Sequence, residues 1–336
     1  MDRWKSVLNA DPTEWLLEPD NPSVRYYTLV HLLERSTDDE EVRQAKLDIM
    51  STGTVPEILS KQNEDGFWGD PKKFYTDKYK GTSWQLLILA ELGADGSQPL
   101  IARACQLILD HSQEAASGGF AVYRSEKTGW GLPGYVVPCL TGNMVWSLIR
   151  LGYLDDERVK KGIAWIDAYQ RFDDGVEVAP TGWPYDKYEM CWGKHSCHLG
   201  VVKALKALAA IPSERRSETT QKTIDQGGEY LLKHHIYKRS HDLSSVSRQG
   251  WLRFGFPLMY QSDILEILLI LTRLNYHDER MQDAINMVVA KQDPQGRWKM
   301  ENSFNGKTQV NIETKGKPSK WLTLNSLRVL KSWYGE

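Results

Sequence analysis

The chain has 336 residues, of which 41% are hydrophobic and 26% are charged. This composition is that of a folded globular protein and excludes a disordered or membrane-embedded chain. The 42 Lys and Arg residues nearly balance the 44 Asp and Glu residues, which excludes the basic surface that nucleic acids and anionic lipids select. We therefore predict no nucleic-acid partner.

The sequence also contains no membrane or export signal that we can identify. The longest apolar stretch, 264–272, is interrupted by Glu266 and is too short to span a bilayer. The segment 1–5 lacks the apolar region of a signal peptide, so we predict a cytoplasmic protein. Four cysteines are too few for a disulfide scaffold and indicate core thiols or metal ligands.

Six apolar segments at a regular spacing are predicted to be helices, with starts 57 to 62 residues apart: 22–35, 81–93, 138–152, 195–210, 257–275 and 318–333. Four of them begin beside a proline, which is favoured in the first helical turn: Pro22, Pro138, Pro257 and Pro318. Gly93, Gly152 and Asn275 follow the last turns of three of them, where a left-handed residue ends a helix.

More charged helices are predicted between these segments, at 39–62, 97–114, 155–171, 213–235 and 278–292. Acidic residues at their starts, as at 155–157, complement the helix dipole. Helical hairpins repeated at one period predict an all-α fold, a single (α/α)6 toroid domain over 1–336. The apolar helices would form its inner ring and the charged helices its outer ring.

Two segments, 62–68 and 292–298, share the pattern Q-x-x-x-G-x-W, and weaker echoes begin at Gln113 and Gln170. In a chain of six helical hairpins, this pattern resembles the repeat of the terpenoid cyclase, squalene oxidase and protein prenyltransferase superfamily. The resemblance implies that the Gln and Trp side chains join hairpins: Gln62, Trp68, Gln292 and Trp298. It also implies a small, hydrophobic, isoprenoid-like substrate in a central cavity, but it does not identify the reaction.

The inner helices of such a toroid run in one direction, so their N-termini meet at one rim. Three cysteines and two histidines are predicted at this rim, and two zinc-ligand sets are compatible with them. One set is Cys191, His195 and His198, which share a stripe if 191–198 is helical. The other is Cys139 with Cys197 and His198, which resembles the zinc site of lanthipeptide cyclases. Alternatively, the thiols are buried in packed helices.

Three residues are candidate catalytic groups at the same rim: Asp263, His195 and Tyr260. The Asp-x-Asp-Asp motif of class II terpene cyclases and the Asp-Asp-x-x-Asp motif of terpene synthases are both absent. Asp263 is an alternative acid if burial raises its pKa, and prenyltransferase β subunits similarly use an Asp with Cys and His to hold zinc. The pair Asp173 and Asp174 is better explained by a solvated turn.

Candidate substrate-binding residues come from a basic cluster and from aromatic rings. Lys238, Arg239 and His241 could hold a phosphate, diphosphate or carboxylate, although cations near 233–235 equally suit a solvated helix C-terminus. The segment 243–257 is predicted to reach over the cavity mouth. The rings that could line the cavity, or simply pack, are Trp130, Trp183, Trp192, Trp251 and Trp321.

These features predict an enzyme, a transferase or a cyclase- or lyase-like enzyme, with possible zinc assistance. One alternative is a carbohydrate-active (α/α)6 enzyme of the glycoside hydrolase or polysaccharide lyase type. Another is a non-catalytic binding subunit with a helical partner. The G-x-G-x-x-G match at 129–134 follows no predicted strand, so we predict no nucleotide cofactor.

Overall fold

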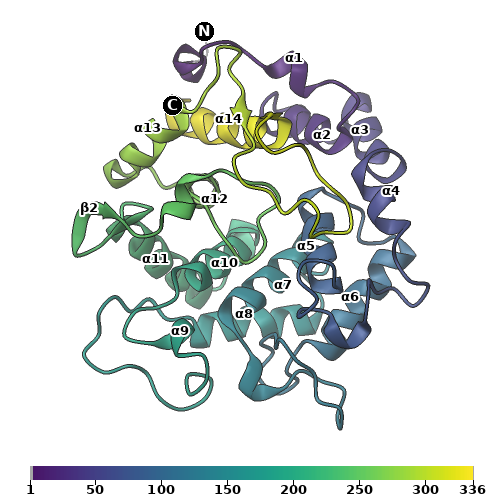
Figure 1. Cartoon of the computed structure of the whole chain (residues 1–336), viewed down its shortest axis with the longest axis vertical. Coiled ribbons are helices and arrows are strands. Elements are labelled where there is room, and N and C mark those ends of the chain that lie inside the picture. Colours follow the sequence, from purple (N-terminus) through teal and green to yellow (C-terminus); the bar gives the residue numbers. More distant parts are fainter. Residues whose placement is uncertain (1–2, 336) are drawn as a thin grey trace.

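A computed structural model describes residues 3–335, and its helices form two concentric rings (Figure 1). The inner ring consists of α2 (Pro22–His31), α5 (Thr82–Glu91), α7 (Pro138–Arg150), α10 (His198–Ala209), α12 (Ile264–Arg273) and α14 (Lys320–Tyr334). The outer ring consists of α3 (Glu40–Ser51), α4 (Thr54–Leu59), α6 (Pro99–His111), α8 (Glu157–Tyr169), α11 (Glu218–Lys233) and α13 (Gln282–Ala290). The predicted all-α toroid is confirmed. Residues 1, 2 and 336 of the predicted domain lie outside the described part.

The division into two rings follows from the distribution of apolar residues. In α5 every residue from Thr82 to Ala90 is buried, because this helix packs against ring neighbours and an outer helix at once. In α6 only a stripe of Ile101, Ala104, Cys105 and Ile108 is buried, with Leu109 beside it. Cys105 is thus a core thiol, as predicted.

Glutamines of the repeated pattern join some of the hairpins to their neighbours. The Gln62 amide donates to the carbonyl oxygens of Gly66 (2.8 Å) and of Leu100 in α6 (2.9 Å). Gln113 makes the same bridge to the carbonyl oxygen of Arg158 in α8 (2.7 Å). Gln170 does not, because its amide donates only to its neighbour Arg171.

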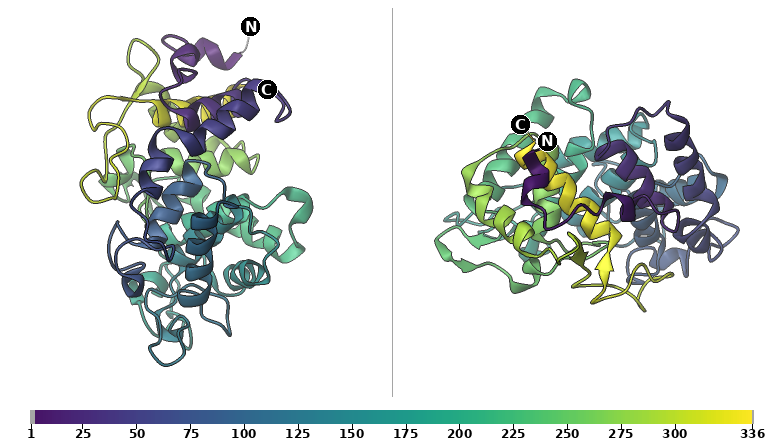
Figure 2. Two further views of the ribbon diagram at one scale, coloured as in Figure 1. Left: turned by 90° about the vertical axis from the view of Figure 1, so that its right-hand side faces the viewer. Right: turned by 90° about the horizontal axis from the view of Figure 1, so that it is seen from above.

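The last copy of the pattern closes the ring. The Gln292 amide donates to the carbonyl oxygen of Val7 (3.0 Å), which lies in the N-terminal 3-10 helix η1 (Arg3–Val7). The indole N–H of Trp298 donates to the carbonyl oxygen of Val288 (2.8 Å), and that of Trp68 donates to the carbonyl oxygen of Ile58 (2.9 Å). Helix α14 contacts η1, α1 (Thr13–Leu16), α2 and α12, and the two chain ends lie close together (Figure 2).

The remaining elements are short. They are α9 (Glu189–Trp192), the strands β1 (Lys238–Arg239), β2 (Asp242–Val246), β3 (Trp298–Lys299) and β4 (Pro318–Ser319), and the 3-10 helices η2 (Pro71–Lys73), η3 (Pro133–Tyr135), η4 (Ser213–Arg215), η5 (Gln249–Leu252) and η6 (Glu279–Met281). The strands form two antiparallel pairs, β1 with β2 and β3 with β4. Within residues 3–335, no helix has the length and apolar character needed to cross a membrane.

Three sequence-based expectations about helix starts were wrong. Pro257 does not begin a helix, because residues 256–263 form a loop and α12 starts at Ile264. Pro318 lies in β4, where it pairs with Lys299, instead of in the first turn of α14. The segment 191–198 is not one helix, because α9 ends at Trp192 and α10 begins at His198.

Candidate functional site in the central cavity

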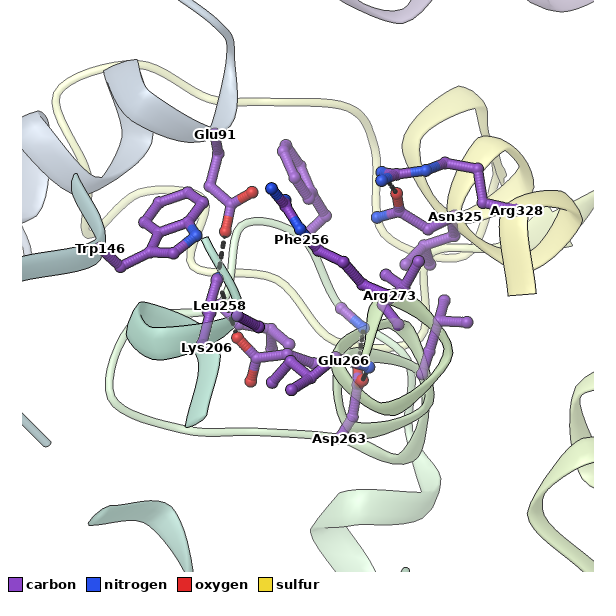
Figure 3. Close-up of a pocket in the computed structure, with 16 residues that line it drawn as sticks. Glu91, Trp146, Lys206, Phe256, Leu258, Asp263, Glu266, Arg273, Asn325 and Arg328 are labelled. Atoms are coloured by element: carbon purple, nitrogen blue, oxygen red, sulfur yellow. Dashed lines mark hydrogen bonds and ion pairs between the residues drawn. The ribbon is translucent and has the colours of Figure 1, made fainter. Parts of the chain in front are cut away.

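The centre of the toroid contains two adjoining cavities. The inner cavity has a volume of about 110 Å³ and is shown in Figure 3, and the outer cavity has a volume of about 930 Å³. Three side chains line both: Leu269, Arg273 and Arg328. The outer cavity is also lined by His31 and Arg150, and because His31, Arg150 and Arg273 end α2, α7 and α12, it lies at the C-terminal end of the inner ring.

The opposite end of the ring is covered by loops. In Figure 1 the chain between β3 and β4 crosses the front of the ring. It is held there by Lys307, whose carbonyl oxygen accepts from Tyr79, and by a bridge between Asn302 and Gly255. Of the segment 243–257, Gly255 and Phe256 line the inner cavity, whereas residues 243–246 belong to β2 at the edge of the toroid.

Asp263 lies on the wall of the inner cavity and is 1% exposed. Its two carboxyl oxygens accept from the backbone N–H groups of Glu266 (2.9 Å) and Gly255 (3.0 Å), so Asp263 also caps α12. Burial raises the pKa of Asp263 to about 7 despite these two hydrogen bonds. The group can therefore exist as acid or as base near neutral pH.

A chain of ion pairs runs along the wall beside Asp263. Lys206 contacts Glu91 and lies 2.9 Å from Glu266, and its ammonium lies 4.1 Å from the ring centre of Trp146. Burial alone would raise the pKa of Glu266, but the charges of Lys203 and Lys206 lower it to about 2. Glu91 and Glu266 therefore both form ion pairs with lysines.

The arginines that line the cavities have few acceptors. Arg150 donates to the hydroxyl of Tyr27 (2.5 Å), and Arg328 donates to Asn325 one turn earlier in α14 (3.4 Å). Among residues 3–335, no carboxylate lies within ion-pair distance of Arg150, Arg273 or Arg328. Figure 3 shows Arg273 and Arg328 extending from α12 and α14 into the same space.

The positive charges of these arginines also affect the pKa of His31. Burial lowers the pKa of His31 to about 3, and the charges of Arg328, Arg150, Arg273 and Lys331 lower it in the same direction. The positive charges of these four residues would attract an anion to the cavity.

The predicted metal ligands lie at the opposite end of the inner helices. The loop from Cys191 to Cys197 brings two thiols together, because the Cys197 N–H donates to the Cys191 carbonyl oxygen (3.2 Å). A hydrogen bond from Cys191 and two backbone N–H groups lower the pKa of Cys197 to about 6, while that of Cys191 is raised. Burial raises the pKa of Cys139 to about 12.

These residues do not fit a three-ligand zinc site as placed. The ring of His198 packs at a tilt against Trp251 with ring centres 4.2 Å apart, and burial lowers the pKa of His198 to about 3. His195 is exposed and lies beside Asp174 (3.3 Å), and the stripe it would share with Cys191 and His198 requires a helix that does not form. Within the described residues, no group of three His, Cys, Asp or Glu side chains is arranged to hold a metal ion.

The other predicted site residues lie outside the walls of both cavities. Tyr260 is half-buried, with the ammonium of Lys78 4.4 Å from its ring centre. Lys238 is paired with Asp283, and Arg239 and His241 are exposed at the β1–β2 hairpin, which lies at the edge of the toroid in Figure 1. These three residues do not come near the central cavity to clamp an anion there.

The predicted aromatic residues have mainly packing roles. Trp192 and Trp251 are buried, and Trp321 stacks on Phe256 with ring centres 4.2 Å apart. Trp130 and Trp183 are 36% and 38% exposed, and neither lines the two cavities. The rings that do line the inner cavity are Trp146 and Phe256.

The sequence reasoning did not identify the arginines, although a signal was present. The segments Arg150 to Tyr153 and Arg273 to Tyr276 share the order Arg-Leu-(Gly or Asn)-Tyr, and both follow an apolar helix. An arginine in the last helical turn is normally explained by the helix dipole. In a toroid, however, the ends of the inner helices converge, so the same residues can meet in the cavity.

Comparison with known proteins finds similar solved structures at low sequence identity and assigns no activity. No family profile and no curated sequence matches the chain. A type II terpene cyclase, MstE from Scytonema, is 15% identical, with 93% of this chain and 87% of that chain covered at a TM-score of 0.41. The GH76A alpha-1,6-mannanase from Salegentibacter sp. HEL1_6 is 10% identical, with 98% and 95% covered at 0.46. Unsaturated glucuronyl hydrolase from Bacillus sp. GL1 is 12% identical, with 96% and 86% covered at 0.45.

Proposed function

We propose that the protein is an enzyme that acts on a small, hydrophobic, isoprenoid-like substrate in the two adjoining central cavities, where the substrate reaches Asp263 on the inner wall. The observation that carries this proposal is Asp263, an acid with a pKa of about 7 on a cavity wall that contains both apolar and charged side chains. A titratable residue whose pKa is strongly shifted inside a cavity is typical of active sites. Trp146, Phe256 and Leu258 supply part of the apolar wall.

In the proposed reaction Asp263 acts as general acid. Its proton passes from the carboxyl oxygen to a carbon–carbon double bond of the substrate, whose π electrons form the new C–H bond and leave a carbocation. The resulting carboxylate is held by the N–H groups of Glu266 and Gly255. Loss of a proton from a carbon next to the cation forms a new double bond and completes the reaction. Positive charge that develops on the substrate would face the rings of Trp146 and Phe256, whose π faces attract cations.

The test combines binding and turnover. Farnesol and geranylgeraniol are screened by native mass spectrometry, and products of any ligand that binds are followed by gas chromatography with mass detection. We expect Asp263→Asn to retain binding and to lose about 100-fold or more of the turnover. Asp283→Asn is the matched control, because Asp283 lies on the surface beside Lys238. Full turnover in Asp263→Asn would overturn the proposed role.

Zinc assistance stays a separate prediction, and no step of the proposed reaction uses a metal. Elemental mass spectrometry of protein purified without a His-tag tests it, with Cys139→Ser and Cys197→Ser beside the native chain. About one zinc per chain, lost in both variants, would support a metal site that forms in another conformation.

The two alternative functions predict other outcomes. A carbohydrate-active enzyme should bind uronate oligosaccharides, and the Trp183→Ala or Trp251→Ala substitution should abolish this binding. A non-catalytic subunit should be inactive alone and should co-purify with a helical partner. Activity of a monomer in gel filtration would count against the subunit hypothesis.

A further inference from the structure

Three arginines from three different inner helices meet at the boundary between the inner and outer cavities. Arg150 ends α7, Arg273 ends α12, and Arg328 lies within α14. Arg273 and Arg328 line both cavities, and Arg150 lines the outer one. The hydroxyl of Tyr27 accepts from Arg150 at 2.5 Å and so fixes the position of this guanidinium.

Within residues 3–335, none of these three arginines forms an ion pair with a carboxylate. Burial and the neighbouring charges of Arg150 and Arg216 lower the pKa of Arg273 to about 10. Burial together with Arg273 and Arg150 lowers the pKa of Arg328 to the same value. Glu91 lies on the same cavity wall, but it is already paired with Lys206. Like charges that are confined without counter-ions destabilise a fold unless a ligand supplies the opposite charge.

The helix dipole explains only part of this arrangement. Arg150 and Arg273 occupy the last residue of their helices, where a cation interacts favourably with the unpaired carbonyl groups. Arg328 is two turns beyond the start of α14 and more than one turn before its end, so the dipole gives it no such advantage. A purely structural role would also allow the side chains to point away from one another, whereas Arg273 and Arg328 extend into one space (Figure 3).

We propose that Arg150, Arg273 and Arg328 bind the phosphate or diphosphate group of a ligand that enters through the outer cavity. A phosphate group carries close to two negative charges at neutral pH and matches three guanidinium groups better than a single carboxylate does. The planar fork of arginine binds such oxyanions through paired hydrogen bonds. This inference rests on the proposed function only for the rest of the ligand, whose apolar part would extend into the inner cavity towards Asp263.

The binding test uses pyrophosphate, inorganic phosphate, geranyl diphosphate and acetate with the full-length protein. Calorimetric titration is performed on the native chain, Arg273→Gln and Arg328→Gln. Arg43→Gln is the matched control, because Arg43 is exposed on α3 and is paired only with Glu40. We expect pyrophosphate to bind the native chain and the control equally and the two cavity variants at least about tenfold more weakly.

The thermal stability without ligand separates a binding role from a structural one. If the arginines are held in place for a ligand, Arg328→Gln relieves repulsion, so the melting temperature rises or stays constant while the stabilisation by pyrophosphate is lost. A lower melting temperature in both variants, with unchanged pyrophosphate binding, would overturn the proposal. Acetate binding as tightly as pyrophosphate would overturn the phosphate assignment.

The anion test is independent of the proposed reaction. Asp263→Asn should bind pyrophosphate like the native chain, because Asp263 lies on the inner cavity wall and is not part of the proposed anion site. If pyrophosphate binds but no isoprenoid compound does, the anion site stands and the proposed substrate fails. Tighter binding of geranyl diphosphate than of pyrophosphate would support both, and pyrophosphate binding that the arginine variants leave unchanged would remove the anion site alone.

Discussion

Lys203 and Glu266 form an ion pair between neighbouring inner helices, with the lysine Nζ 2.7 Å from both carboxylate oxygens. The side chain of Lys203 is 0% exposed and that of Glu266 is 7% exposed. Removing one partner of a buried pair leaves an uncompensated charge. We expect Glu266→Gln to lower the free energy of unfolding by about 3–5 kcal/mol, measured by urea denaturation.

The control for this prediction is an exposed ion pair of the same chemistry. Glu229 binds Arg280 at 2.7 Å, but its side chain is 64% exposed. Solvent screens such pairs, so Glu229→Gln should cost about 0–1 kcal/mol. Equal losses in the two variants would show that burial does not decide the contribution of Glu266.

Asp263 should make the stability of the protein fall as the pH rises. Its pKa is raised from 3.8 to about 7, so the folded state binds this proton more tightly than the unfolded state does. The free energy of unfolding therefore decreases between about pH 4 and pH 7 and stays at the lower value above pH 7. Asparagine cannot ionise and still caps a helix well. We expect Asp263→Asn to gain stability relative to the native chain between pH 5 and pH 8, measured by urea denaturation at both values.

The comparison variant for the pH experiment is Asp283→Asn. A hydrogen bond from Lys238 lowers the pKa of Asp283 below 3.8, so this carboxyl is ionised in both states throughout the tested range. The stability difference between Asp283→Asn and the native chain should therefore be the same at pH 5 and pH 8. A constant difference for Asp263→Asn as well would contradict the raised pKa.

The fold could be predicted from the sequence because both rings are encoded locally. Each inner helix is an apolar run at a regular spacing. The outer helices have an apolar stripe, and those other than α6 also have acidic residues in the first turn, as in α3 and α8. The start of α12 could not be predicted, because residues 256–259 are as apolar and as buried as the helix that follows them. The apolar composition of this segment reflects its burial. It does not distinguish a loop from a helix, because that depends on the hydrogen bonds of the backbone.

The candidate site was harder to predict, because it depends on which way side chains point. Cysteines, histidines and Asp263 drew attention to the N-terminal ends of the inner helices, and of these only Asp263 lines the inner cavity. Arg150 and Arg273 have the sequence context of ordinary helix ends. Only the closure of the ring shows that these ends face one another across a cavity.

A glutamine that bonds to a distant part of the chain should contribute more to stability than one that bonds only to its neighbour. Gln62 joins its own turn to α6 through the carbonyl oxygens of Gly66 and Leu100, whereas Gln170 donates only to its neighbour Arg171. Gln62→Leu removes both bonds and leaves polar groups without a partner, so we expect a loss of about 1–3 kcal/mol. Gln170→Leu is the matched control and should cost less than about 1 kcal/mol. Thermal denaturation measures both, and a loss for Gln170→Leu as large as that for Gln62→Leu would mean that the bridge to α6 does not stabilise the ring.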